Sequence, residues 1–336
     1  MRARRVAAVM AVALLGMPAC GGDGGGSPEA STPSSRPDET SVSAPGERIV
    51  FSRNEGGDML STYTVQTDGS DVQPLFQEGS SEMPRWSPDG SQVQIFCCDE
   101  PVAAHLIDPV SGNVRTLPLP DPALEAHCGF AWSPDGRRLA CEVFGVEDDH
   151  LNGIYSIRTS DGGGLQRITT SPGGDDIPGD YSPDGTRMVF TRSSAEGDAG
   201  LFVTDVDEAG LRELTDPDRP LVDISPGSWS PTGDQILFAA RRNEDHHKTI
   251  WVVNADGSSL HELAIDPTCG GLWSEPEAIG CYSPTWSPDG RRIAFVRSTP
   301  AGVDDGIFIV NADGSGLVRV TDGEDDQPDW GTVPEG

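Results

Sequence analysis

The sequence is poor in positive charge and has no apolar run long enough to cross a membrane. Its 336 residues include only 23 lysines and arginines against 54 aspartates and glutamates, which gives a formal net charge of −31. Lys248 is the single lysine. Because a nucleic-acid backbone repels such a surface, we do not expect nucleic-acid binding. The apolar run at residues 6–15 is too short for a transmembrane helix.

Catalytic and metal-binding motifs of fixed spacing are also missing. The chain has no Cys-x-x-Cys pair, no Gly-x-Ser-x-Gly elbow and no phosphate-binding or dinucleotide-binding glycine motif. His261-Glu262 begins like a zinc-protease motif but lacks the second histidine, and the segment 205–210 fails the calcium-loop pattern at Ala209. We therefore expect no cofactor, although clustered acids leave calcium binding open. An enzyme whose site is scattered over loops also stays open.

The N-terminal 46 residues have the character of a targeting segment and a tether. Three arginines precede the apolar run, and small residues then lead to Cys20, which resembles a bacterial lipoprotein signal. This predicts a signal peptide at 1–19 and a lipidated Cys20. Residues 20–46 are rich in Gly, Ser and Pro and are expected to be a disordered tether. The protein is then extracytoplasmic and attached to the membrane outer face by its lipid alone, or secreted if Cys20 is not lipidated.

Six further cysteines suit disulfides in an oxidising compartment. Cys269 and Cys281 share one long loop and are expected to pair. Cys128 and Cys141 flank a hairpin turn and could meet across adjacent strands. The neighbours Cys97 and Cys98 cannot be assigned.

A repeated motif of an aromatic residue followed by Ser-Pro-Asp-Gly organises the rest of the chain. The aromatic ends a strand, and proline, aspartate and glycine then suit the successive positions of a tight turn. A repeat of 44 to 57 residues with one such signature is typical of propeller blades. The copies are at 86–90, 132–136, 181–185, 229–233 and 286–290, with a truncated sixth copy at 328–331.

Each repeat predicts a blade of four antiparallel strands, so the fold class is an all-β, six-bladed β-propeller over residues 47–332, followed by a tail at 333–336. The segment 48–51 has a second-strand sequence with no first strand before it. The C-terminal segment around Trp330 has a first-strand sequence. It can therefore supply the inner strand of blade 1 and close the ring, which removes exposed sheet edges.

The Trp-Ser-Pro-Asp-Gly motifs and the Asn-Ala-Asp-Gly turns at 254–257 and 311–314 resemble the TolB-like propeller family over residues 48–332. This resemblance implies the fold and a role in binding partner proteins of the bacterial envelope without catalysis. Related propellers belong to peptidases, lyases and lactonases, so the fold by itself does not select the function.

The longer and more variable loops are expected on one face of the ring, between second and third strands and between blades, and that face is the better candidate for recognition. The second-to-third loops each carry at least two acids, which we expect to form an acidic rim that attracts cations or a basic protein. Trp273, in the loop between the paired cysteines 269 and 281, is a candidate contact residue. Blade-to-blade acids expected to add to the rim include Asp175, Asp176, Asp180, Glu324, Asp325 and Asp326. The candidate partner-binding acids are Glu55, Asp58, Asp99, Glu100, Asp148, Asp149, Glu244, Asp245, Asp304 and Asp305.

These features favour a non-catalytic envelope lipoprotein that binds or scaffolds an envelope protein or peptide, through a basic segment of that partner. Two alternatives stay open. One is a metal-assisted lyase or lactonase with a site built from loops. The other is a sensor domain that binds calcium or a small ligand.

Overall fold

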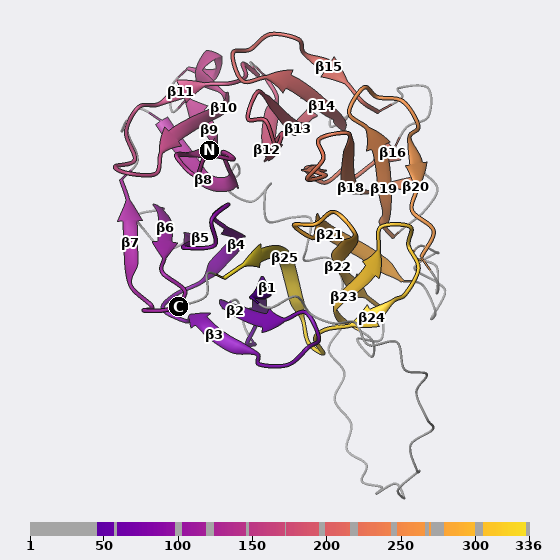
Figure 1. Ribbon diagram of the computed structural model, residues 1–336. Coiled ribbons are helices and arrows are strands. Elements are labelled where there is room, and N and C mark those ends of the chain that lie inside the picture. Colours follow the sequence, from indigo (N-terminus) through magenta and orange to yellow (C-terminus); the bar gives the residue numbers. More distant parts are fainter. Residues whose placement is uncertain are drawn as a thin grey trace, which may run out of the picture. The chain divides into compact units, whose positions relative to one another are not determined.

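The computed structural model describes residues 46–56, 59–97, 103–118, 124–145, 148–171, 173–194, 199–215, 221–242, 247–265, 269, 279–299 and 305–333. These residues form six antiparallel sheets arranged as the blades of a propeller (Figure 1). The predicted fold class is confirmed. The N-terminal tether and Cys20 lie outside the described residues, so lipidation remains a prediction.

Within each blade the strands run in order from the inner to the outer edge of the sheet. Blade 1 contains β25 (Asp325–Thr332), β1 (Glu47–Asn54), β2 (Leu60–Gln66) and β3 (Gln73–Phe76), and blade 2 contains β4 (Ser81–Trp86), β5 (Val93–Cys97), β6 (Ala103–Ile107) and β7 (Val114–Leu117). Blade 3 contains β8 (Leu124–Trp132), β9 (Arg138–Gly145), β10 (Gly153–Arg158) and β11 (Gln166–Arg167), with the 3-10 turn η1 (Asp149–Leu151) between β9 and β10. Blade 4 contains β12 (Asp175–Tyr181), β13 (Arg187–Ser193), β14 (Ala199–Asp205) and β15 (Arg212–Glu213). Blade 5 contains β16 (Leu221–Val222) and β17 (Ser228–Trp229), which both pair with β18 (Gln235–Arg242), then β19 (Thr249–Asn254) and β20 (His261–Glu262). Blade 6 contains β21 (Gly280–Trp286), β22 (Arg292–Ser298), β23 (Gly306–Asn311) and β24 (Val318–Arg319).

The Ser-Pro-Asp-Gly motif forms a tight turn between the first and second strands for a local reason. In blade 2, the Ser87 hydroxyl donates to Asp89 over 2.7 Å and accepts from the backbone N–H of Gln92 over 2.9 Å. The Gly90 N–H donates to the Ser87 carbonyl, and Gly90 has a φ of +69°, which favours glycine. The serine therefore ties the two strand ends together through its side chain.

The C-terminal strand closes the ring, as predicted. Strand β25 pairs antiparallel with β1, with Ile49 opposite Trp330 and Arg48 opposite Gly331, and the register shifts between Val50 and Ser52. In Figure 1 the yellow β25 lies inside the indigo β1. Blade 1 is thus completed by residues from both ends of the described chain, and β1 has no open edge.

Six apolar clusters, one at each interface between adjacent blades, hold the ring together. The alternation of side chains along a strand sends successive residues to opposite neighbours. In β18, Ile236 and Phe238 pack toward blade 4, whereas Leu237 packs toward blade 6. Each motif aromatic joins one of these clusters, as Trp229 does between blades 4 and 5. The aromatic residue that recurs in the sequence therefore contributes one buried side chain to each of the six interfaces between blades.

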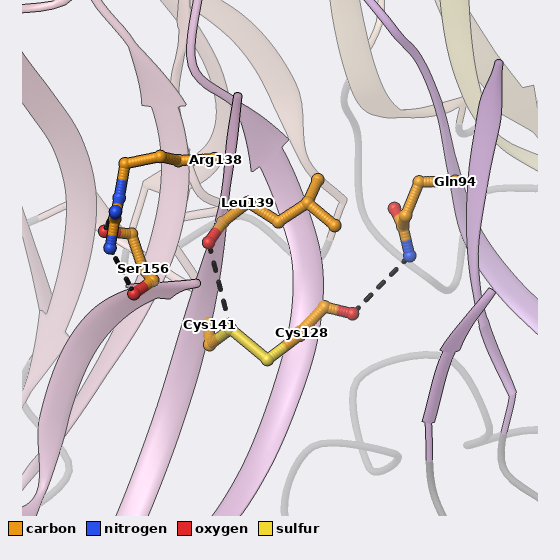
Figure 2. Close-up of a disulfide and its surroundings, with 6 residues drawn as sticks. All are labelled: Gln94, Cys128, Arg138, Leu139, Cys141 and Ser156. Atoms are coloured by element: carbon orange, nitrogen blue, oxygen red, sulfur yellow. Dashed lines mark hydrogen bonds between the residues drawn. A yellow bond between two sulfur atoms is a disulfide. The ribbon is translucent and has the colours of Figure 1, made fainter. Parts of the chain in front are cut away.

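Both predicted disulfides are present. Cys128 on β8 lies directly opposite Cys141 on β9, with Cα atoms 4.0 Å apart, and Cys269 is bonded to Cys281. Figure 2 shows the first bond joining the two strands within blade 3. The Gln94 side chain of blade 2 donates to the Cys128 carbonyl over 3.5 Å, which links the two blades beside the disulfide.

Candidate functional site

One position of the inner strands carries a charged residue in three of the six blades. It is the residue just before each motif aromatic, and the repeat brings it to the inner edge of all six blades. In blades 1, 2 and 4 this residue is charged. From blade 1 to blade 6 the six residues are Asp329, Arg85, Ala131, Asp180, Ser228 and Thr285.

The two aspartates at this position connect neighbouring blades. The backbone N–H of Trp86 in blade 2 donates to Asp329 Oδ2 of blade 1 over 2.7 Å. The backbone N–H of Trp229 in blade 5 donates to Asp180 Oδ2 of blade 4 over 3.2 Å. Each carboxylate thus satisfies a backbone donor of the next blade and keeps a second oxygen that is not used in this contact.

The environment of Asp180 favours its neutral form. Burial, together with the negative charge of Asp329, raises the pKa of Asp180 to about 7. The N–H of Trp229 and the positive charge of Arg85 oppose this shift. Burial likewise raises the pKa of Asp329, against the charge of Arg85. Since blades 1 and 4 are three steps apart in a ring of six, the two carboxyls approach the axis from opposite sides.

A second pair of charges lies nearer the face with the variable loops. Asp326 Oδ1 accepts from the Ser283 hydroxyl over 2.9 Å and from the Gln327 backbone N–H over 2.6 Å. Burial raises the pKa of Asp326. Burial also lowers the pKa of Lys248, whose positive charge is favoured by Asp223 and Asp326. The single lysine of the sequence therefore lies close enough to Asp326 for their charges to interact.

These five side chains form what we call the axial charge cluster. Each is only partly exposed, and none makes an ion pair with another described residue. The cluster therefore holds charges that interact through space without being neutralised by direct contact. Its members are Arg85, Asp180, Lys248, Asp326 and Asp329.

Four of the predicted partner-binding acids lie among the described residues. Glu55, Asp148 and Asp149 are exposed in second-to-third loops of blades 1 and 3, whereas Asp305 of blade 6 is half-buried. Local hydrogen bonds hold some of them, since Asp148 accepts from the His150 N–H at the start of η1. The other predicted contact residues lie outside the described residues and remain predictions, namely Asp58, Asp99, Glu100, Glu244, Asp245, Asp304 and Trp273.

Several acids expected in blade-to-blade loops belong instead to inner strands, which is a correction. Asp180 is one of them, in β12. Asp176 is buried in β12 and paired with Arg192 over 2.7 Å, and Asp325 is buried in β25 and paired with Arg53 over 2.6 Å. These two acids are not rim groups. Sequence reasoning missed this because it drew the inner strands too short; Asp175 and Asp326 are further members of those strands.

A pocket of about 300 Å³ lies between blades 3 and 4 on the opposite face, beside the short turns. It coincides with the one full motif copy that has tyrosine, Tyr181, in place of tryptophan. At two other interfaces the arginine after the turn stacks on the next tryptophan, as Arg187 does on Trp229 at 4.7 Å. In this blade Arg138 instead donates to Ser156 over 2.8 Å (Figure 2). The pocket therefore lies where the motif aromatic is the smaller Tyr181 and where Arg138 bonds Ser156 and does not stack on that aromatic.

Among the described residues, no three or more His, Cys, Asp and Glu side chains gather in a way that could hold a metal ion. The described part of the chain also contains no helix long and apolar enough to span a membrane. His261 and Glu262 form β20, the short outer strand predicted for that blade.

No family model matches the chain. Protein Atu1656 of Agrobacterium fabrum is 29% identical over 229 residues, which cover 64% of this chain and 69% of that protein. The TolB homologue of Chlorobium luteolum is 28% identical over 170 residues, which cover 48% of this chain and 35% of the homologue.

Several solved structures share the fold. TolB from Acinetobacter baumannii is 19% identical with a TM-score of 0.65, over 84% of this chain and 66% of that one. An oligogalacturonate lyase in complex with manganese is 13% identical with a TM-score of 0.54, over 82% of this chain and 74% of the lyase. The blade topology, the closing strand and these similarities agree, and the chain has a six-bladed β-propeller fold like that of TolB.

Proposed function

We propose that the propeller is a non-catalytic recognition module that binds a positively charged segment of an envelope protein on its variable-loop face. The axial charge cluster carries this proposal. It contains three carboxyl groups and two cationic groups, and none of them is satisfied by an ion pair with a described residue. A cationic group brought to this face would favour the ionised forms of the three acids.

The exposed rim acids give the same face a long-range attraction. The net charge of −31 and the exposed Glu55, Asp148 and Asp149 attract a basic partner and speed its encounter. In this proposal the lipidated Cys20 and the tether at 20–46 keep the module at the membrane outer face. The lipid chain supplies the attachment and the propeller supplies the specificity.

The test compares two variants that lose the same number of carboxylates from opposite faces. The rim variant is E55Q/D148N/D149N/D305N. The control variant is D68N/D207N/D256N/D313N, whose aspartates lie in turns between third and fourth strands and accept local backbone N–H groups through Oδ1. Asparagine keeps that acceptor, so the control changes charge with little change in structure.

Crosslinking in intact cells, followed by affinity purification and mass spectrometry, identifies the captured protein, and its affinity is then measured with both variants at several salt concentrations. We expect the rim variant to lose at least tenfold in affinity, mostly through slower association, while the control variant keeps it. Equal losses in both variants would show a general charge effect. Unchanged binding by the rim variant would contradict the proposal.

A metal-assisted lyase is the second candidate, because an oligogalacturonate lyase crystallised with manganese shares the fold. The described residues do not fit such a site, since no group of three metal-binding side chains gathers among them. Metal analysis of the purified protein and assays on oligogalacturonate test this candidate. Turnover that depends on a bound divalent metal would favour it over the recognition module.

A further inference from the structure

An arginine and its partner recur at the same place in three blades. Near the end of the second strand, Arg53 in blade 1, Arg192 in blade 4 and Arg297 in blade 6 occupy equivalent positions, two residues after a buried phenylalanine. Each guanidinium lies over an aromatic ring of its own blade, with distances to the ring centroid of 5.2 to 5.3 Å. The repeat therefore supplies three copies of one structural unit.

In two copies the inner strand completes the unit with an aspartate. Arg53 lies directly opposite Asp325 and donates to both carboxylate oxygens, over 2.6 and 2.9 Å. Arg192 lies directly opposite Asp176 and donates to both oxygens over 2.7 Å. This two-pronged contact is the geometry in which a guanidinium binds a carboxylate most strongly.

In blade 6 a cysteine stands in place of the aspartate. The residue directly opposite Arg297 is Cys281, which is fully buried and bonded to Cys269. Arg297 is 8% exposed, makes no ion pair with a described residue, and its Nε is enclosed without a hydrogen-bond partner among those residues. A buried guanidinium without a counter-charge is costly, by several kcal/mol in general. Arg53 and Arg192 each have an aspartate as counter-charge. Among the described residues, Arg297 has no such carboxylate.

The surroundings add a second positive charge. The guanidinium of Arg319 also lies over the Phe308 ring, with its carbon 5.9 Å from the centroid, while that of Arg297 is 5.2 Å away. Arg319 is oriented by donating to the backbone carbonyls of Thr321 and Asp305. Two guanidinium groups therefore share one ring, which strengthens the attraction for an anion at this point.

We propose that Arg297 binds the carboxylate of a small organic acid from solution, in place of the aspartate found in blades 1 and 4. A carboxylate matches the fork of donors that Arg53 and Arg192 use. Arg297 keeps 8% of its surface exposed, so the side chain is not fully sealed from solvent. This site is separate from the proposed protein-binding function and is tested by a separate measurement.

The test is equilibrium dialysis of the full-length protein with radiolabelled acetate, at constant ionic strength set by sodium chloride. We expect one equivalent of acetate bound saturably by the wild type and at least tenfold weaker binding by Arg297→Gln. The control is Arg137→Gln, which removes the same charge from an exposed side chain. It should bind acetate as the wild type does. Equal binding by the wild type and Arg297→Gln would overturn the proposal.

Melting curves give a second and independent readout. Acetate should raise the melting temperature of the wild type by about 3 °C at ten times the dissociation constant, and should not raise that of Arg297→Gln. Without acetate, Arg297→Gln should melt no lower than the wild type, whereas Arg192→Gln should melt lower because it leaves Asp176 buried without its partner. If Arg297→Gln melts lower than the wild type in acetate-free buffer, the claim that Arg297 lacks a counter-charge is wrong.

The chain also contains its own candidate carboxylates. Glu275 and Glu277 lie in the sequence between the two bonded cysteines. If wild type binds no acetate but the E275Q/E277Q variant binds one equivalent through Arg297, the carboxylate comes from the chain itself and the proposal of an external acid is wrong. If both proteins bind acetate equally, the external acid is supported.

Discussion

The half-buried carboxyl of Asp180 should make the stability of the propeller fall between pH 4 and pH 8. Its pKa is about 7 in the folded protein, against 3.8 for the ordinary side chain. In this window the folded state holds a proton that the unfolded chain has released, so a rise in pH favours unfolding. The loss is complete once the pH passes the folded pKa.

The size of the effect follows from the shift. A shift of about three units corresponds to about 4 kcal/mol at 1.36 kcal/mol per unit, and to about 2 kcal/mol once solvent contact of the partly exposed carboxyl is allowed for. The substitution Asp180→Asn removes the titration and keeps a side-chain oxygen that can accept the Trp229 N–H. The range from pH 5 to pH 8 covers about two of these three units, so we expect this variant to be about 1.3 kcal/mol more stable relative to wild type at pH 8 than at pH 5.

Chemical denaturation of both proteins at half-unit steps from pH 5 to pH 8.5 measures this difference. Asp184→Asn is the matched control, because Asp184 is an exposed turn residue whose pKa of about 2 lies below the window. Its stability profile should run parallel to that of the wild type. Parallel profiles for wild type and Asp180→Asn would refute the assignment of a raised pKa to Asp180.

Three further predictions concern the closure and packing of the ring. Gly331→Ala should cost about 1–3 kcal/mol in a denaturant titration, because its Cβ would clash with the Trp86 ring; a neutral effect would show that this interface is loosely packed. C128A/C141A should lose about 3 kcal/mol, since the bond closes a loop of 13 residues, and calorimetry of the variant and wild type under oxidising conditions checks it. Deletion of residues 325–336 should abolish cooperative unfolding and cause aggregation, because it opens the edge of β1; a monomeric, cooperatively melting product would contradict the closing role of β25.

The sequence determined the repeat and therefore the fold. Turn chemistry is local, so Ser87, Asp89 and Gly90 specify their hairpin without any distant partner. The spacing of the aromatics then specified six blades, and the truncated copy at Trp330 specified the closing strand. Cys128 and Cys141 could be paired from sequence because a hairpin places its flanking residues opposite each other.

The site was decided by tertiary structure. Asp180 and Asp329 are 149 positions apart in the chain, and only the closed ring brings them to opposite sides of one axis. The sequence pattern led us to expect Asp176 on the rim, because a pattern contains the residue types and their spacing. It does not contain the residue that lies opposite on the neighbouring strand, which here is Arg192. The comparison of Arg192 with Arg297 shows the same limit.

These two arginines stand at equivalent positions in sequence, and the difference between them lies in the residue opposite. Register pairs Arg192 with an aspartate and Arg297 with a disulfide-bonded cysteine. Local chemistry thus sets the strands and turns, because it acts between neighbours in the chain. Whether a charge is neutralised depends on contacts between strands, which exist only after the blades have formed.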